Sequence, residues 1–387
     1  MSESYQAVVV GLGAMGSAAV YHLAGSGLRV LGIDRFHPPH DLGSSHGSSR
    51  LIRQAYFEGP AYVPLVLRAY ELWAELEHHS GRRLLTETGG LMIGRPSSNV
   101  VRGSLHGARE HGLEHVVYEP EQLRARFTQF VFDPDCVGLY ESRAGVLVPE
   151  RCIEAHLELA SRCGATIQFD DPLVSLRGLG TKGPLELITA GRRYETERVV
   201  MCGGPWTPEL VPRLKVPLTV ERQVMHWFDP GKEIESFLPS RFPVFVWEHG
   251  NGTVAYGIPA MDGRKGGVKF AFHSLSGRRC TPDTLSRIVT HEEVELAGSY
   301  LRQYVPALAS GHLRSAACMY TLTPDRHFVI DFLPEDRRVI VAAGFSGHGF
   351  KFASVMGEIL AELTIRGASR WDLSTFSASR NYDGSLA

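Results

Sequence analysis

The fold is decided by the stretch VVVGLGAMG at residues 8–16. It is a G-x-G-x-x-G pattern that leaves an apolar strand and enters a helical pattern, and Asp34 ends the next strand. Gly11 permits a tight turn, Gly13 lets the backbone approach a pyrophosphate, and Gly16 lets helix and strand pack closely. Amides at the helix N-terminus would bind phosphates, and Asp34 would accept hydrogen bonds from a ribose. The acid favours FAD or NAD over NADP, but the pattern does not distinguish FAD from NAD.

One nucleotide-binding domain is predicted from three segments, residues 1–85, 145–217 and 321–387. Its expected elements are a strand over 5–10, a helix from residue 14, strands over 28–33, 198–202 and 339–343, a helix over 61–80 ended by Gly81, and a helix carrying Val355 and Leu363. The intervening segments, 86–144 and 218–320, are richer in β-branched and aromatic residues with frequent Gly and Pro. We therefore expect an α/β plus α+β fold, a Rossmann-like domain interleaved with a mostly antiparallel β-sheet substrate domain.

Composition excludes several classes of protein. The chain has 387 residues, 43% of them hydrophobic, which is enough for a large core. Lys and Arg number 40 against 42 Asp and Glu, so no basic field for nucleic acid is present. The six cysteines include no CxxC pair, and we predict neither a disulfide framework nor a metal site. Residues 1–6 lack the features of a signal peptide, so we expect a cytoplasmic protein that does not enter a membrane.

Two further glycine-rich runs carry cations. The first, GSSHGSSRLIR at residues 43–53, places Arg50 and Arg53 three residues apart. The second, GFSGHGFK at residues 344–351, opens a helical pattern and ends in Lys351. A glycine-rich turn at the start of a helix suits backbone contact with a cofactor. A solvated basic turn is an equally supported interpretation of the first run when it is taken alone.

Five motifs occur in order along the chain: the fingerprint at 8–16, the loop at 43–53, GGPWT at 203–207, Lys269 with His273, and the paired runs CMYTLTPD at 318–325 and GFSGHGFK at 344–351. In these motifs the chain resembles the monomeric sarcosine oxidase family, which includes N-methyltryptophan and pipecolate oxidases. The resemblance covers nearly the whole chain. It implies FAD as the cofactor and an FAD-binding domain of the glutathione-reductase and D-amino-acid-oxidase type.

The resemblance implies a covalent flavin. Cys318 matches the family's cysteine that is bonded through sulfur to the 8α carbon of FAD, and a nearby cation would stabilise both the thiolate and an anionic ring. Arg50 and His46 match family residues that lie close to the ring and are expected to act in catalysis. A buried structural cysteine is the alternative for any single Cys.

The resemblance also assigns the substrate pocket. Arg53 and Lys351 match the pair that binds the substrate carboxylate, a task suited to a guanidinium fork and an ammonium point charge. Lys269 matches a lysine that activates oxygen, since a fixed positive charge stabilises the charge that develops on it. His273, four residues farther along the strand, would point the same way.

Aromatic residues of the family wall the substrate cavity, and Tyr256 and Tyr320 match them, although a Tyr in a sheet is more often part of the core. Val246 departs from the pattern, because it stands where the sarcosine enzymes carry a methionine.

The predicted reaction is oxidation of a small secondary amino acid, N-methyl or cyclic, with molecular oxygen as acceptor and hydrogen peroxide as product, by a monomeric enzyme. Sarcosine, pipecolate, proline and N-methyltryptophan all remain open as substrates. A dehydrogenase of the same fold and a non-catalytic flavin-binding subunit are the alternatives. The residues expected to bind FAD are Cys318, Gly11, Gly13, Gly16, Asp34, Ser44, Ser49, Arg50, Gly203, Gly347, His348, Gly349 and Lys351.

Overall fold

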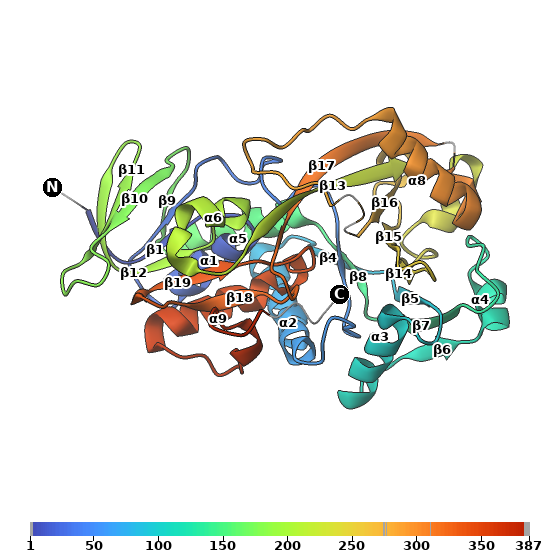
Figure 1. Ribbon diagram of the computed structural model, residues 1–387, viewed down its shortest axis with the longest axis horizontal. Helices are drawn as coiled ribbons and strands as arrows, with labels where there is room; N and C mark the ends of the chain where they lie inside the picture. Colours follow the sequence, from blue (N-terminus) through green and yellow to red (C-terminus); the bar gives the residue numbers. More distant parts are fainter. Residues whose placement is uncertain (1–2, 274, 276, 310, 383–387) are drawn as a thin grey trace.

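A computed structural model describes residues 3–273, 275, 277–309 and 311–382 of the chain. Met1 and Ser2 lie outside these residues. They are the first two of the six residues from which the absence of a signal peptide is predicted. Within the described residues the strands form two eight-stranded sheets and one three-stranded sheet. Figure 1 shows the two large sheets toward opposite ends of an elongated molecule. The long strands β13 (Thr219–Phe228) and β17 (His312–Leu322) belong to the second sheet and extend from it toward the first.

The first sheet is built on parallel strands in the order β9-β2-β1-β12-β19. These are β9 (Thr166–Gln168), β2 (Val30–Ile33), β1 (Glu3–Val10), β12 (Arg193–Met201) and β19 (Asp336–Ala343). Three strands are added in antiparallel pairings, β10 (Leu173–Arg177), β11 (Leu185–Thr189) and β18 (Val329–Leu333). Because the carboxyl ends of parallel strands meet at one edge, the turns that follow β1, β2, β12 and β19 gather there.

Helices cover one face of this sheet. They are α1 (Ala14–Gly25), α2 (Tyr62–Ser80), α5 (Pro149–Arg162) and α9 (Ala353–Arg366). Ala7 and Val9 of β1 share a core with these helices, whereas Val8 and Val10 belong to the core on the opposite face, as the period-two alternation of a strand requires.

The elements of this domain largely follow the sequence pattern. The predicted helix over 61–80 is confirmed, and Gly81 ends it in the left-handed conformation, φ 67°. The strand predicted from residue 28 begins instead at Val30, because the Leu28 amide still bonds the Leu23 carbonyl at the end of α1.

The second sheet has the order β17-β13-β16-β15-β14-β5-β7-β6. Its other strands are β16 (Val268–Phe272), β15 (Val254–Ile258), β14 (Val244–Glu248), β5 (Gly90–Gly94), β7 (Val137–Glu141) and β6 (Val116–Tyr118). Among the described strands, every neighbouring pair is antiparallel except β5 with β14. The mostly antiparallel sheet expected from the sequence is therefore confirmed.

Shorter elements complete the fold. They are α3 (Asn99–Glu110), α4 (Pro120–Arg126), α6 (Thr207–Leu210), α7 (Gly263–Gly266), α8 (His291–Tyr304), and a small sheet of β3 (Arg50–Ile52), β8 (Gly145–Leu147) and β4 (Leu85–Glu87). The strands of the first sheet come from the three segments predicted for the nucleotide-binding domain, and those of the second from the other two, except that β17 runs on to Leu322. A division into two domains at the predicted boundaries stays a prediction.

In the part of the chain that the structure describes, no helix combines the length and apolarity needed to cross a membrane.

Candidate active site

A cavity of about 640 Å³ lies between the carboxyl ends of the parallel strands and one face of the second sheet. Its lining includes the fingerprint turn after β1, residues 43–45 and 49–51, the turn 203–206 after β12, and residues 344–351 after β19. Strands β13 to β17 of the second sheet also contribute to the lining, as do the segment after β2, residues 53, 57 and 58, and residues 171–174. A single elongated ligand in this cavity can therefore contact the nucleotide-binding turns and the substrate sheet together.

Gly11 and Gly16 have the conformation and the packing expected of a fingerprint turn, and the contact of Gly13 with a pyrophosphate stays a prediction. Gly11 has a φ of +86°, and a Cβ on Gly16 would lie 1.7 Å from the Gly11 carbonyl oxygen, so only glycine allows α1 to pack this closely on the turn. Gly11 and Gly13 line the cavity, whereas Gly16 lies behind the turn. No side chain caps the N-terminus of α1, so its first amides are available to an anion.

Asp34 lines the cavity and also braces the fingerprint. Its Oδ2 accepts a hydrogen bond from the Leu12 amide at 2.6 Å, and its Oδ1 accepts one from the Phe36 amide at 2.8 Å. Burial raises the pKa of this carboxyl, although both amides act to lower it. Each carboxylate oxygen has a second lone pair, so Asp34 can still accept from a ribose hydroxyl.

One face of the second sheet carries Lys269 and Cys318. Lys269 of β16 lies opposite Trp227 of β13, and Cys318 of β17 lies opposite Gln223. Because register partners point to the same face and alternate residues share it, the ladder aligns Gln223 and Trp227 with Lys269 and Cys318. His273, just beyond β16, lines the cavity with Lys269, in agreement with the predicted alternation.

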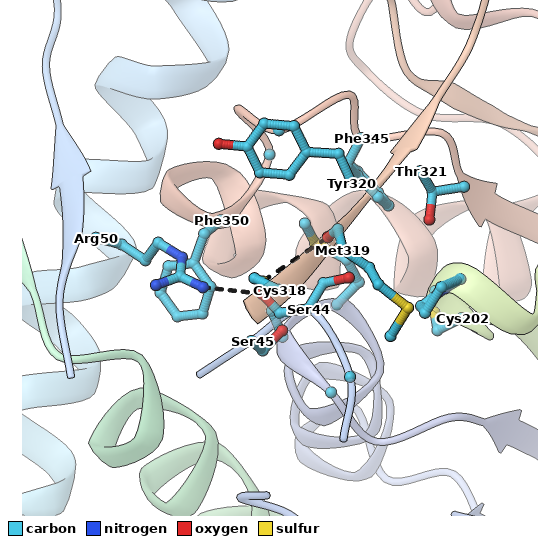
Figure 2. Close-up of a pocket in the computed structure, with 18 of the residues that line it drawn as sticks. Ser44, Ser45, Arg50, Cys202, Cys318, Met319, Tyr320, Thr321, Phe345 and Phe350 are labelled. Carbon is cyan, nitrogen blue, oxygen red and sulfur yellow. Dashed lines mark hydrogen bonds between the residues drawn. The ribbon is translucent and has the colours of Figure 1, made fainter. Parts of the chain in front are cut away.

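Cys318 is buried beside a guanidinium (Figure 2). Its Sγ lies 3.7 Å from the carbonyl oxygen of Ser44, and that oxygen also accepts a hydrogen bond from Arg50 at 2.9 Å. Arg50 donates a second hydrogen bond to the Ser49 carbonyl at 2.8 Å. Cys318 is a free thiol that lines the cavity close to the guanidinium of Arg50.

The ammonium of Lys269 is held by backbone carbonyls. The side chain is 2% exposed, and Nζ donates to the carbonyl oxygens of Ser49 at 2.9 Å and Gly47 at 3.1 Å. Burial holds the pKa of Lys269 well below its ordinary value, and the charge of Arg50 lowers it further. An ammonium fixed in this way acts strongly on charge that develops nearby, because the surroundings are dry.

Arg53 is also buried, but it has a carboxylate partner. Its guanidinium donates to Glu58 at 2.5 Å and to the Ala55 carbonyl at 2.7 Å, and it lies 4.3 Å from the ring centroids of Tyr56 and Phe57. Burial alone would raise the pKa of Glu58, but the nearby cations, Arg53 above all, lower it to about 2. Sequence reasoning missed Glu58. The available signal was an acid five residues after a predicted buried arginine, since buried charges are paired.

Lys351 lies close to Arg53 in a network of hydrogen bonds. Its Nζ donates to the His348 carbonyl at 2.8 Å and to the Tyr56 hydroxyl at 3.4 Å. His348 Nε2 bonds the Arg326 carbonyl at 3.0 Å and is therefore protonated, so Nδ1 accepts from Tyr56 at 2.7 Å. Burial lowers the pKa of Lys351 to about 7, and Arg53 adds to this effect.

His46 lies outside the cavity lining. It is 6% exposed, its Nε2 has no hydrogen-bond partner, and burial lowers its pKa to about 3, with Arg50 and Lys269 adding to the effect. No direct contact of His46 with the cavity supports its predicted catalytic role. Ser44 and Ser49, from the same loop, do line the cavity.

The other predicted residues line the cavity as expected from the family. Tyr256 lies opposite Val246 across β15 and β14, and burial raises the pKa of Tyr256. Tyr320 lies 5.5 Å from His273 between ring centroids. The lining also includes Gly203, Gly347 and Gly349. Among the described residues, no group of three or more His, Cys, Asp and Glu side chains is arranged to hold a metal ion.

Comparisons with known proteins identify the family of the chain. The model of the FAD dependent oxidoreductase family matches residues 6–363. A protein from Streptomyces avermitilis called monomeric sarcosine oxidase is 44% identical over 381 residues, covering 98% of both chains. An N-methyl-L-tryptophan oxidase from Yersinia pestis is 33% identical over 377 residues, covering 97% of this chain and 99% of its own. The solved structure of L-proline dehydrogenase from P. horikoshii has a TM-score of 0.83 at 22% identity and covers 98% of each chain, which shows a shared fold.

Proposed function

Because this chain belongs to the FAD dependent oxidoreductase family, we propose that it is an FAD-dependent oxidase of a small N-methyl or cyclic amino acid, with oxygen as acceptor and hydrogen peroxide as product. Relatives called monomeric sarcosine oxidase and N-methyl-L-tryptophan oxidase support this reaction class. The observation that carries the proposal is one cavity joining a dinucleotide-binding turn to the buried cations Arg53, Lys351 and Lys269. That the enzyme is monomeric and cytoplasmic stays a prediction.

The residues that line the cavity are chemically suited to bind FAD. The fingerprint turn packs closely on the end of β12, since a Cβ on Gly11 would lie 2.4 Å from the Cys202 carbonyl oxygen. Gly11 and Gly13, which have no side chains, line the cavity, so a pyrophosphate could contact their backbone. Uncapped amides of α1 and the carboxylate of Asp34 provide donors and acceptors for an adenosine diphosphate. The thiol of Cys318 and the guanidinium of Arg50 lie in the same cavity, near where a flavin ring would extend.

When bound, FAD would accept a hydride from the substrate and pass two electrons to oxygen. The side chains then have separate tasks. Arg53 and Lys351 bind the carboxylate and so fix the position of the carbon that is oxidised. Their positive charge also favours the neutral amine, which is the form that can give up hydride. Lys269 stabilises the negative charge that develops on oxygen.

The panel of substrates gives the direct test. The purified protein is mixed without air with sarcosine, pipecolate, proline and N-methyltryptophan in turn, while the flavin absorbance is followed. We expect at least one amino acid to bleach the flavin, and air to restore the colour with formation of peroxide. Bleaching without peroxide would show a dehydrogenase, and no bleaching by any of them would refute the oxidase proposal.

We further propose that FAD is attached through Cys318 as an 8α-S-cysteinyl link. Forming the link would replace one S–H and one C–H bond with an S–C bond, and the two electrons and two protons released would reduce one molecule of oxygen to hydrogen peroxide. Cys318→Ser should therefore release its flavin on acid precipitation, whereas the parent should retain a yellow pellet. Cys202→Ser is the matched control, because Cys202 is also a buried thiol that lines the cavity. Equal release from parent and Cys318→Ser would contradict the link.

A further inference from the structure

The ammonium of Lys269 depends on a short loop for its position. Both of its acceptors, the carbonyls of Gly47 and Ser49, belong to residues 47–49. Among the described residues, no carboxylate forms a direct ion pair with Lys269. The position of this charge is therefore set by whatever holds the loop.

A single peptide group connects the ammonium to a distant carboxylate. The carbonyl of Gly47 accepts from Lys269, and the N–H of the same peptide, on Ser48, donates to Glu150 Oε1 at 3.0 Å. In a trans peptide the C=O and N–H point in opposite directions, so the ammonium and the carboxylate lie at the two ends of one dipole. The positive ammonium contacts the negative carbonyl end of the peptide dipole, and the negative carboxylate contacts its positive N–H end. In a hydrogen-bonded chain of this kind each bond polarises the next and strengthens it.

Glu150 fixes the loop by a second hydrogen bond. The Gly47 amide donates to the same Oε1 at 2.9 Å, so successive amides converge on one oxygen, as in backbone sites for anions. The turn is tight, since φ is +99° at Gly47 and +64° at Ser48, and the Ser49 amide bonds the Gly47 carbonyl at 2.8 Å. A Cβ on Gly47 would lie 2.9 Å from Met225 Cε and 3.3 Å from Lys269 Nζ.

Glu150 itself is well placed to hold this charge. It is the second residue of α5 (Pro149–Arg162), where the helix dipole favours a carboxylate. The other titratable or charged groups that act on Lys269 are Arg50 of β3, His46 of the loop, and Arg314 and Cys318 of β17. The two arginines lower the pKa of Lys269, whereas Cys318 and, after it, Glu150 raise it.

We propose that Glu150 is a positioning residue for the reaction with oxygen: through the peptide between Gly47 and Ser48 it holds the ammonium of Lys269 in place. The inference rests on the proposed oxidase function, because it gives Lys269 the role of stabilising charge on oxygen. Glu150 acts through the loop and does not need to contact substrate or cofactor.

The first test isolates the reaction with oxygen. Holoenzyme is reduced with dithionite without air and mixed with oxygenated buffer, and flavin absorbance is followed. In Glu150→Gln, which keeps the shape but loses the charge, we expect the rate constant for reoxidation to fall about tenfold and its pH profile to move to lower pH. Glu154→Gln is the matched control, since Glu154 lies on the same helix, pairs with Arg82 and is half-exposed. Reoxidation of Glu150→Gln at the parent rate would overturn the proposal.

Dithionite replaces the substrate in this test, so the result does not depend on which amino acid is oxidised. Failure of the proposed function would instead appear as a flavin that no amino acid in the panel reduces. The two outcomes are therefore distinguishable.

The second test does not use activity. The unfolding temperature is measured for the parent, Glu150→Gln, Lys269→Met and the double variant. If the peptide couples the two charges, Glu150→Gln should lower the unfolding temperature more in the parent than in the Lys269→Met background. Equal shifts in the two backgrounds would overturn the coupling, even if reoxidation slowed for another reason.

Discussion

Lys269 and Arg53 are both 2% exposed and line the same cavity, but their charges are compensated in different ways. Lys269 bonds backbone carbonyls, whereas Arg53 bonds the carboxylate of Glu58. A carbonyl satisfies the hydrogen-bonding capacity of a cation without cancelling its charge. While Lys269 is protonated its field therefore acts on the cavity without a carboxylate to oppose it directly, whereas that of Arg53 is largely neutralised until a second carboxylate arrives.

This difference suits the proposed partners of the two cations. Oxygen carries no charge when it enters, so a cation that stabilises the product of electron transfer has to be in place beforehand. An amino acid brings its own carboxylate, which can share the guanidinium with Glu58 or take its place. Lys351 stands between these cases, because its neighbours are neutral acceptors and its pKa of about 7 makes its charge depend on pH.

The largest effect is expected for Lys269→Met. Loss of the buried ammonium should slow reoxidation of the reduced flavin by about 10² to 10³-fold, while anaerobic reduction by substrate changes little. Stopped-flow measurement of the two half-reactions checks this. Lys265→Met, an exposed lysine in α7, is the control. Equal slowing of flavin reduction and flavin reoxidation would mean that Lys269 contributes to the reaction with substrate as much as to the reaction with oxygen. The proposed difference in role between Lys269 and Arg53 would then be wrong.

A somewhat smaller effect is expected for Arg53→Met. Truncating one partner of a buried charge pair costs about 2 to 5 kcal/mol, so kcat/KM for the amino acid should fall by at least about thirtyfold. Reoxidation of the dithionite-reduced enzyme should keep the parent rate. The variant also leaves Glu58 without its partner, so Arg53→Met with Glu58→Gln is the necessary control. An unchanged kcat/KM would remove Arg53 from the carboxylate site.

Lys351 should make ligand binding depend on pH. Below its pKa of about 7 the ammonium is charged, and as pH rises through that value the proton is lost, so a carboxylate ligand binds more weakly. Titrating the flavin absorbance with propionate, which has no amine of its own, should show affinity falling by about three- to tenfold from about pH 6 to about pH 8. Lys351→Met should bind weakly with little dependence on pH. The same slope in both proteins would place the titrating group elsewhere.

Residues close in sequence or set by strand alternation were predictable. The turn from β1 into α1, the end of α2 at Gly81, and the shared face of Lys269 and His273 all follow from periodicity of 2 or 3.6 residues and from glycine at defined positions. The resemblance placed Cys318, Arg53 and Lys351, and the structure brings them to one cavity.

Partners joined across the fold were not predictable in the same way. Glu150 and Gly47 are 103 residues apart, and no periodic pattern in either segment indicates that they meet. The parallel pairing of β5 with β14 likewise depends on how two distant segments of the substrate sheet are ordered. His46 lies in a loop whose path is set by such contacts, which is why its position behind the cavity wall could not be read from the run at 43–53.

The smallest effect is expected for Glu58→Gln, which makes Arg53 resemble Lys269. The amide can still accept a hydrogen bond from the guanidinium but no longer neutralises it, so a ligand carboxylate loses both a competitor and a repelling charge. Because the pKa of Glu58 is about 2, the parent carboxylate is charged throughout the working range, and propionate should bind about two- to fivefold more tightly to the variant at every pH tested. Glu71→Gln, an exposed acid on α2, is the control. Weaker binding in Glu58→Gln would mean that the acid holds Arg53 in its binding orientation, so that the two cations differ in how they are positioned and not in how far their charge is neutralised.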